Sequence, residues 1–459
     1  MTTSDRSADS HAAVDRIPLS SNLKLLTLFD KGSSEGAFGP RHLVVHGWRV
    51  RGPLDLDALR GALGDVVTRH EMLRTEIVRD EGEIHQRIHS PERPEVRVHD
   101  LEPDVNRSRE EQVDDFVNEV EAGSLEVSVL PHLRVEVGRF DENDAVLVLV
   151  THHTASDGWS LHVIVRDLAA YYARRCEGET VELPSREQYR DFVYWQQEML
   201  AGPEAESARE YWREKLAGSR ILDIDADKHV TDEIASVYSV RRFIMDQELT
   251  KSILDFSRMM RCSPFMTLLA TLKLYLHRKT SFDDLVVPVI TSGRTESSFH
   301  ESVGPFFNMV PLRTSIEGCR SFFDFMLRVR ATCLEGYSHE LPFSEVVAQA
   351  PEIISTYERP DNAVVAIQVL QFPAMTESEV IGGLEYTEVR RRTKSYPETS
   401  DIPNGILLGM DILPDDEIAG TLRFDSNQFH DETIIEMIDS YKDLLRSVLI
   451  DPNRPLGSL

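Results

Sequence analysis

The sequence lacks the features of metal-cluster, secreted and membrane proteins. Its four cysteines form no CxxC pair and no short spacing with histidines, which argues against a zinc site or a disulfide framework. No apolar run approaches the roughly 20 residues of a membrane helix, and the first sixteen residues hold no apolar signal-peptide segment. These absences predict a cytoplasmic protein with no membrane partner and with a disordered tail over residues 1–16.

Positive charge is also scarce. Lys and Arg number 50 against 78 Asp and Glu, so the formal net charge is −28. Binding to a phosphate backbone needs clustered cations, and we therefore expect no nucleic-acid partner. With 41% hydrophobic and 28% charged residues, the 459-residue chain has the composition of a globular protein of two or three units.

Strand and helix patterns alternate along the chain, which predicts an α/β protein. Residues 42–51 have strand composition, and a helical pattern follows behind Asp55, which suits an N-cap. Further patterns predict a hairpin over 72–89, a helix over 107–122, strands over 133–140 and 144–153, and a helix from Ser160 to near Gly178. A polar, proline-containing stretch at 177–188 then precedes a second half of similar style. We predict an N-terminal subdomain over 17–182 and a C-terminal subdomain over 183–459.

The strand at 144–153 delivers two histidines into a loop that ends at a helix. A neutral imidazole can accept a proton from an attacking amine or alcohol. Because neighbouring strand positions point to opposite faces, one histidine is the base and the other is structural. From these residues alone two alternatives stay open: the pair and Asp157 cap the strand and helix, or His153 and Asp157 bind a metal. Since the spacing supplies no third ligand, we predict no metal.

Five ordered motifs resemble those of the condensation domains of nonribosomal peptide synthetases. HHTASDGWS at 152–160 is similar to their HHxxxDG signature. The other four are RHEMLRTEI at 69–77, YRDFVYWQ at 189–196, VGPFFNMVPLR at 303–313 and HELPFSEVV at 339–347. The resemblance spans nearly the whole chain. It implies an α/β fold of two chloramphenicol-acetyltransferase-like subdomains in a V, with a tunnel between them.

The resemblance also implies roles for individual residues. His153 is the catalytic second histidine with His152 beside it, Asp157 is structural, and Gly158 offers a backbone N–H near the reacting carbonyl. Arg294 is expected to hold Asp157 in an ion pair. The remaining motif residues, expected to line the tunnel or support the architecture, are Trp159, Ser160, Arg69, Arg74, Trp195 and Asn308.

The function implied is condensation of an acyl or aminoacyl thioester on a carrier protein with a small free amine or alcohol. Resemblance to free-standing enzymes of antibiotic pathways, above all the ester-forming enediyne type, makes ester formation credible. No cofactor is expected in the protein, because the partner carrier supplies the phosphopantetheine arm. The basic segments 173–175 and 389–394 are candidates for carrier docking. An unusual late segment, 390–405, favours a small diffusible acceptor over a second carrier-bound one.

Other functions of the same fold remain alternatives. One is an acyltransferase that takes its donor from coenzyme A, and another is a non-catalytic module that recruits carrier proteins. Such modules usually lose the second histidine, which is present here. An epimerization domain would need a second acid that ITSGRTESS at 290–298 lacks, and a heterocyclization domain would replace the histidines by aspartates.

Overall fold

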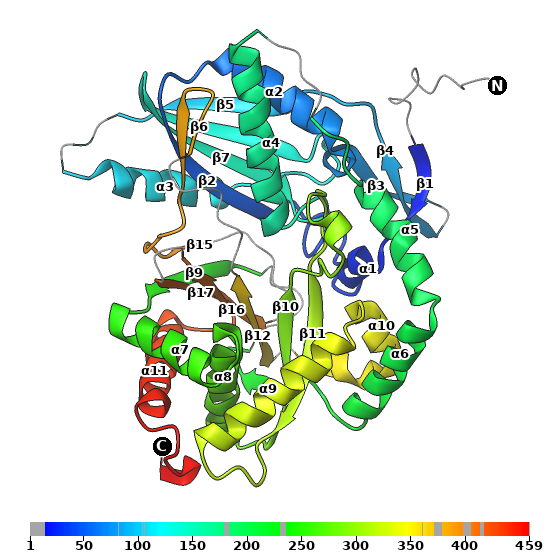
Figure 1. Ribbon diagram of the computed structural model, residues 1–459, viewed down its shortest axis with the longest axis vertical. Coiled ribbons are helices and arrows are strands. Elements are labelled where there is room, and N and C mark those ends of the chain that lie inside the picture. Colours follow the sequence, from blue (N-terminus) through cyan, green and yellow to red (C-terminus); the bar gives the residue numbers. More distant parts are fainter. Residues whose placement is uncertain are drawn as a thin grey trace. The chain divides into compact units, whose positions relative to one another are not determined.

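The computed structural model describes residues 14–80, 82–102, 104, 106–178, 183–229, 236–359, 361–370, 379–397, 405–413 and 417–458. The chain divides into two compact units, each built on its own sheet (Figure 1). Unit 1 comprises residues 1–197, 294–306 and 375–389, and unit 2 comprises residues 198–293, 307–374 and 390–459.

Unit 1 is built on a six-stranded sheet in the order β13-β14-β2-β7-β6-β5. Its strands are β13 (Glu379–Ile381), β14 (Leu384–Glu388), β2 (Leu43–Arg51), β7 (Asp144–His152), β6 (Leu133–Asp141) and β5 (Glu95–Asp100). The pairs are antiparallel except β5 with β6. Every residue of β7 is buried, as expected for a central strand covered on both faces.

Helices cover both faces of this sheet. Side chains of α2 (Leu56–Arg69) and α4 (Gly158–Cys176) form one apolar core with β2 and β7, and α3 (Arg109–Glu121) forms a second core on the opposite face. A separate three-stranded sheet has the order β1-β4-β3. The remaining elements of unit 1 are β1 (Val14–Pro18), β3 (Thr75–Asp80), β4 (Glu83–Ile88), α1 (Ser21–Thr27), η1 (Glu71–Arg74), η2 (Ser297–Phe299) and most of α5 (Tyr189–Leu200).

Unit 2 is built on a sheet in the order β11-β10-β12-β16-β17-β9-β15, with β8 paired to β12. Its strands are β8 (Asp223–Asp225), β9 (Tyr238–Ile244), β10 (Asp284–Thr291), β11 (Asn308–Ser315), β12 (Asn362–Leu370), β15 (Tyr396–Pro397), β16 (Gly405–Ile412) and β17 (Ile418–Asp425). Its helices are α6 (Pro203–Leu216), α7 (Gln247–Met259), α8 (Pro264–Thr280), α9 (Phe322–Ser338), α10 (Phe343–Gln349), α11 (Asp431–Ile450), η3 (Pro351–Glu358) and η4 (Leu456–Ser458). Helices α7, α9 and α11 each contact α8 (Figure 1).

The division into units differs from the predicted boundary between residues 182 and 183. Residues 183–197 remain with unit 1, and the chain returns to unit 1 twice more, at 294–306 and 375–389. These returns depend on contacts between residues far apart in sequence, such as the pairing of β14 with β2, which a local pattern cannot reveal. The predicted tail also ends earlier than expected, because residues 14–16 belong to β1; residues 1–13 lie outside the described residues.

Two predicted helix starts have different outcomes. Asp55 caps α2 as predicted, since its carboxylate accepts hydrogen bonds from the N–H groups of Asp57 and Ala58. The start of α4 at Ser160 is wrong: the helix begins at Gly158, and Asp157 is the N-cap that accepts from the Ser160 N–H. Within the described residues, no helix is long and apolar enough to cross a membrane.

Candidate active site

The histidine loop joins the end of β7 to the start of α4. His152 is the last residue of β7 and is fully buried. Its Nε2–H donates to the Gly39 carbonyl (2.9 Å), and its Nδ1 lies 2.7 Å from the Thr154 hydroxyl. Burial lowers the pKa of His152 to about 3, so its ring stays neutral. These contacts suit the structural role predicted for it.

His153 is only partly buried and is the first residue beyond the strand. Its Nδ1 lies 2.9 Å from the Ser156 carbonyl oxygen. Because a carbonyl can only accept, Nδ1 must carry the proton, and Nε2 is then the basic nitrogen of the neutral ring. The loop therefore presents His153 in the tautomer that a general base requires.

A third histidine, His42, belongs to this site, although no sequence motif indicates it. The His42 ring stacks on the His153 ring, with centroids 4.6 Å apart and planes 25° apart. Its Nδ1–H donates to the Ala37 carbonyl (2.9 Å), and the His153 N–H donates to the His42 carbonyl (2.8 Å). Burial, followed by the charge effects of His153 and His152, lowers the pKa of His42 well below its ordinary value. A neutral ring thus supports one face of His153.

Asp157 is the centre of a buried hydrogen-bond network. Its Oδ1 accepts from the Ser160 N–H (2.8 Å), the Ser160 hydroxyl (2.7 Å) and Arg294 Nη2 (3.0 Å), while Oδ2 accepts from the Phe306 N–H (3.1 Å). The predicted Asp157–Arg294 ion pair is therefore present. Both residues belong to unit 1, however, whereas the predicted boundary between residues 182 and 183 places them in different subdomains.

The Arg294 guanidinium also contacts backbone carbonyls and aromatic rings. Its Nη1 donates to the carbonyls of Phe299 (2.8 Å) and Ser302 (2.9 Å), and its guanidinium lies 4.0 Å from the centre of the Phe306 ring. The Trp159 ring is also close, at 5.7 Å, and the Trp159 Nε1–H donates to the His300 carbonyl. Segment 294–306 is thus fastened to the first turn of α4.

Gly158 is the first residue of α4. Its N–H belongs to the four that no helical carbonyl can accept, and it lies at the positive end of the helix dipole. An oxygen that gains negative charge beside it would be stabilised there.

The other predicted support residues have architectural contacts. Arg69 joins α2 to α4 through Asp167 (2.7 Å), and Arg74 donates to the His89 carbonyl. Trp195 stacks on Phe192 within α5.

Asn308 belongs to unit 2 and secures the start of α10. Its amide donates to the Leu341 carbonyl and accepts from the Phe343 N–H, both at 2.9 Å. All three of these residues lie in unit 2.

The chain matches the family model described as "Condensation domain" over residues 43–459. It therefore belongs to the condensation-domain family, and its α/β condensation-domain fold is confirmed. Condensation domains are acyl-transferring enzymes that form amide or ester bonds with carrier-tethered substrates.

Individual relatives refine this placement. The chain is similar to the SgcC5 protein from Streptomyces globisporus, solved with (R)-(-)-1-(2-naphthyl)-1,2-ethanediol and sucrose. The two are 39% identical with a TM-score of 0.91, and the match covers 95% of this chain and 100% of that one. The X-domain from teicoplanin biosynthesis is 22% identical with a TM-score of 0.80, covering 97% and 98% of the two chains, and shows the fold alone.

Among curated proteins, phosphinothricin tripeptide synthetase PhsC from Streptomyces viridochromogenes is 29% identical over 92% of this chain. A dimodular nonribosomal peptide synthase from Bacillus subtilis is 28% identical, also over 92% of it. The chain spans only 38% and 18% of the lengths of these two proteins.

Proposed function

We propose that the chain condenses an acyl or aminoacyl thioester, delivered on the phosphopantetheine arm of a carrier protein, with a small free alcohol or amine. The observation that carries this proposal is the hydrogen bond from His153 Nδ1–H to the Ser156 carbonyl, which makes Nε2 the basic nitrogen. Family membership supports the acyl-transfer chemistry. The similarity to SgcC5, solved with a diol, supports an alcohol as acceptor and an ester as product. The proposal extends to antibiotic biosynthesis of the enediyne type, for which the support is the sequence resemblance alone.

In the proposed reaction, the acceptor oxygen or nitrogen attacks the thioester carbonyl. His153 Nε2 takes the proton that this attack releases, and the carbonyl oxygen becomes an oxyanion beside the Gly158 N–H. The tetrahedral intermediate then collapses, breaking the carbon–sulfur bond. His153 returns its proton to the departing phosphopantetheine thiolate, so the enzyme ends unchanged and needs no cofactor of its own.

The rest of the site positions His153 in this scheme. The His42 ring limits tilting of the His153 ring, and the Asp157–Arg294 network fixes the turn from which α4 begins. Neither group needs to touch the substrate. Their contribution is orientation, which is a large part of the barrier reduction in reactions between two bound partners.

Each of the two basic segments contains an arginine that forms an ion pair within the protein. Arg175 forms a bidentate ion pair with Asp65 (2.6 and 2.8 Å), and Arg391 pairs with Glu417 (2.9 Å). Since most carrier proteins are acidic and this chain has a net charge of −28, docking has to rely on local charge or apolar contact. Replacing Arg174, which is exposed, tests the first segment without breaking the Arg175 pair.

The function is tested by intact-mass detection of an acyl-carrier protein incubated with the enzyme and a panel of small alcohols and amines. We expect discharge of the carrier and an equal amount of ester or amide, with slow thioester hydrolysis. The same acyl group on coenzyme A forms a second arm, and a second loaded carrier protein forms a third. Product from the coenzyme A arm alone would favour the acyl-CoA acyltransferase, and product only with a second carrier would contradict the small acceptor. Binding without product in any arm would indicate a recruitment module.

A further inference from the structure

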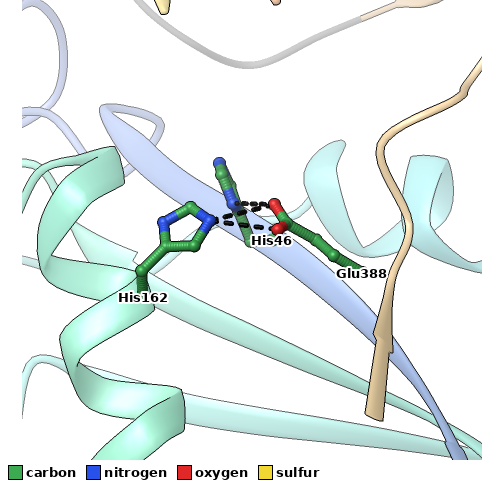
Figure 2. A group of neighbouring side chains, drawn as sticks. All are labelled: His46, His162 and Glu388. Carbon is green, nitrogen blue, oxygen red and sulfur yellow. Dashed lines mark hydrogen bonds and ion pairs between the residues drawn. The ribbon is translucent and has the colours of Figure 1, made fainter. Parts of the chain in front are cut away.

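Unit 1 contains a second cluster of titratable side chains, to which no role in the condensation reaction has been assigned. His46 on β2, His162 on α4 and Glu388 on β14 converge on one point (Figure 2). The Glu388 carboxylate lies 3.1 Å from His162 Nε2 and 3.4 Å from His46 Nδ1. The two imidazole rings are 5.4 Å apart and nearly perpendicular.

The spacing of these atoms suits a tetrahedral metal ion. Zinc bonds of about 2.0–2.2 Å to nitrogen and oxygen place the ligand atoms of a tetrahedron roughly 3.4 Å from one another. Two of the three spacings are already near that value, and all the ligand atoms lie within 4.8 Å of one another.

The surroundings also suit a metal ligand set. The His162 Nδ1 donates to the Gly158 carbonyl (2.9 Å), which fixes the ring so that Nε2 faces the cluster. Ligating histidines commonly donate their second ring N–H to a carbonyl in this way. The side chains of His162 and Glu388 are 7% and 12% exposed, that of His46 is 26% exposed, and the Trp48 ring packs beside both imidazoles. The site is therefore largely buried, and His46 is its most exposed side chain.

The backbone explains why the three side chains meet. Glu388 pairs with Trp48 across the β14–β2 ladder, and His46 lies two residues before Trp48. Strand residues two apart share a face, and paired residues on neighbouring strands do so as well. Helix α4 covers that face of the sheet and contributes His162.

We propose that His46, His162 and Glu388 bind one zinc ion, with a water molecule as the fourth ligand. In the metal-free protein His162 Nε2 lies 3.1 Å from both oxygens of the Glu388 carboxylate. When zinc binds, the carboxylate and both imidazoles become ligands, and any proton held between them passes to solvent. The sequence predicts no metal because it contains no closely spaced set of metal ligands. That argument does not apply to this set, because its three residues span more than 300 positions of the sequence.

The bound ion would fasten β14 to the first turns of α4. Segment 375–389 belongs to unit 1 but follows most of unit 2 in the sequence. Its attachment to unit 1 therefore depends on contacts between residues far apart in sequence, such as those of Glu388 with His46 and His162. The site is therefore structural, and the proposal is independent of the condensation reaction.

Zinc titration of tag-free, metal-free protein tests the proposal. By calorimetry and native mass spectrometry we expect one equivalent of zinc, and we expect zinc to raise the melting temperature. Glu388→Gln, which keeps the shape of the side chain, and His46→Asn, at the most exposed of the three side chains, should each weaken zinc binding more than tenfold.

A matched control is available on β5. His99 Nε2 lies 2.7 Å from a Glu136 oxygen, but this pair is not part of a three-ligand group in the described part of the chain. His99→Gln should leave zinc affinity within about twofold of the parent. Circular dichroism of each metal-free variant verifies folding. The proposal is overturned if the parent protein takes up less than one equivalent, or if Glu388→Gln and His46→Asn both bind zinc as tightly as the parent.

Discussion

Replacing Arg294 by Met removes the cation of the buried Asp157 network while keeping much of the side-chain volume. The parent side chain is 1% exposed, and its guanidinium donates hydrogen bonds to Asp157, Ser160, Phe299 and Ser302. Its loss leaves a buried carboxylate without its counter-charge and two carbonyls without a charged donor. Removing one partner of such a pair typically destabilises a protein by about 3–5 kcal/mol.

The remaining contacts of Asp157 set where in this range the result falls. The Ser160 N–H, the Ser160 hydroxyl and the Phe306 N–H still donate to the carboxylate in the variant. These three donors offset part of the lost charge, so we expect about 3 kcal/mol. The measurement is urea unfolding followed by tryptophan fluorescence, because Trp159 lies beside Arg294.

Two comparisons make this experiment decisive. Arg139→Met removes an arginine whose ion pair with Asp100 is 46% and 75% exposed, and it should cost less than about 1 kcal/mol. The double variant Asp157→Asn/Arg294→Met should be more stable than the sum of the two single effects predicts, because both members of the pair are then gone. A loss below about 1 kcal/mol for Arg294→Met, or strict additivity in the double variant, would refute the reasoning.

Three further predictions concern stability. Gly304→Ala would place a Cβ 2.1 Å from a ring carbon of the buried Tyr189, and overpacking of this kind should cost about 1–3 kcal/mol in urea unfolding; an unchanged midpoint would contradict it. Burial lowers the pKa of His152 to about 3 and of His132 to about 4, so below about pH 6.5 the unfolded chain binds more protons. Stability should therefore fall as the pH drops, by about 1.4 kcal/mol per histidine at about pH 5.5, and equal midpoints at about pH 7.5 and 5.5 would argue against this. Burial also lowers the pKa of Lys273 to about 7, so its contribution makes stability rise between about pH 7 and 10, and Lys273→Met should flatten that rise; an identical pH profile would exclude the effect.

Local patterns predicted the strand that carries the histidine loop, and the reason is physical. A strand with apolar side chains at every position from 145 to 150 exposes no apolar surface only when both of its faces are buried. The structure buries every residue of β7. The start of α4 was harder to predict, because both Asp157 and Ser160 are good N-caps. Asp157 takes that place in the structure, where its carboxylate also binds Arg294 and the Phe306 N–H.

The sequence could not reveal the contacts that link distant segments. His42 reaches His153 because β2 pairs with β7, and nothing in the composition of residues 42–51 marks its first histidine as part of a site. The return of 379–388 to unit 1, which brings Glu388 to His46, has no local signal either. The family motif identified Arg294 as the partner of Asp157, but the sequence did not show that Arg294 belongs to unit 1.

The central claim is that His153 Nε2 accepts the proton of the attacking acceptor. The most direct test is the single-turnover rate at which an acyl-carrier protein is discharged by a saturating alcohol, measured for the parent, His153→Ala and the control His99→Gln. We predict a rate lower by roughly a hundredfold or more for His153→Ala, since general-base catalysis typically contributes about 10²–10⁴-fold, and an unchanged rate for the control. A folded His153→Ala variant that discharges the carrier at the parent rate would contradict the account.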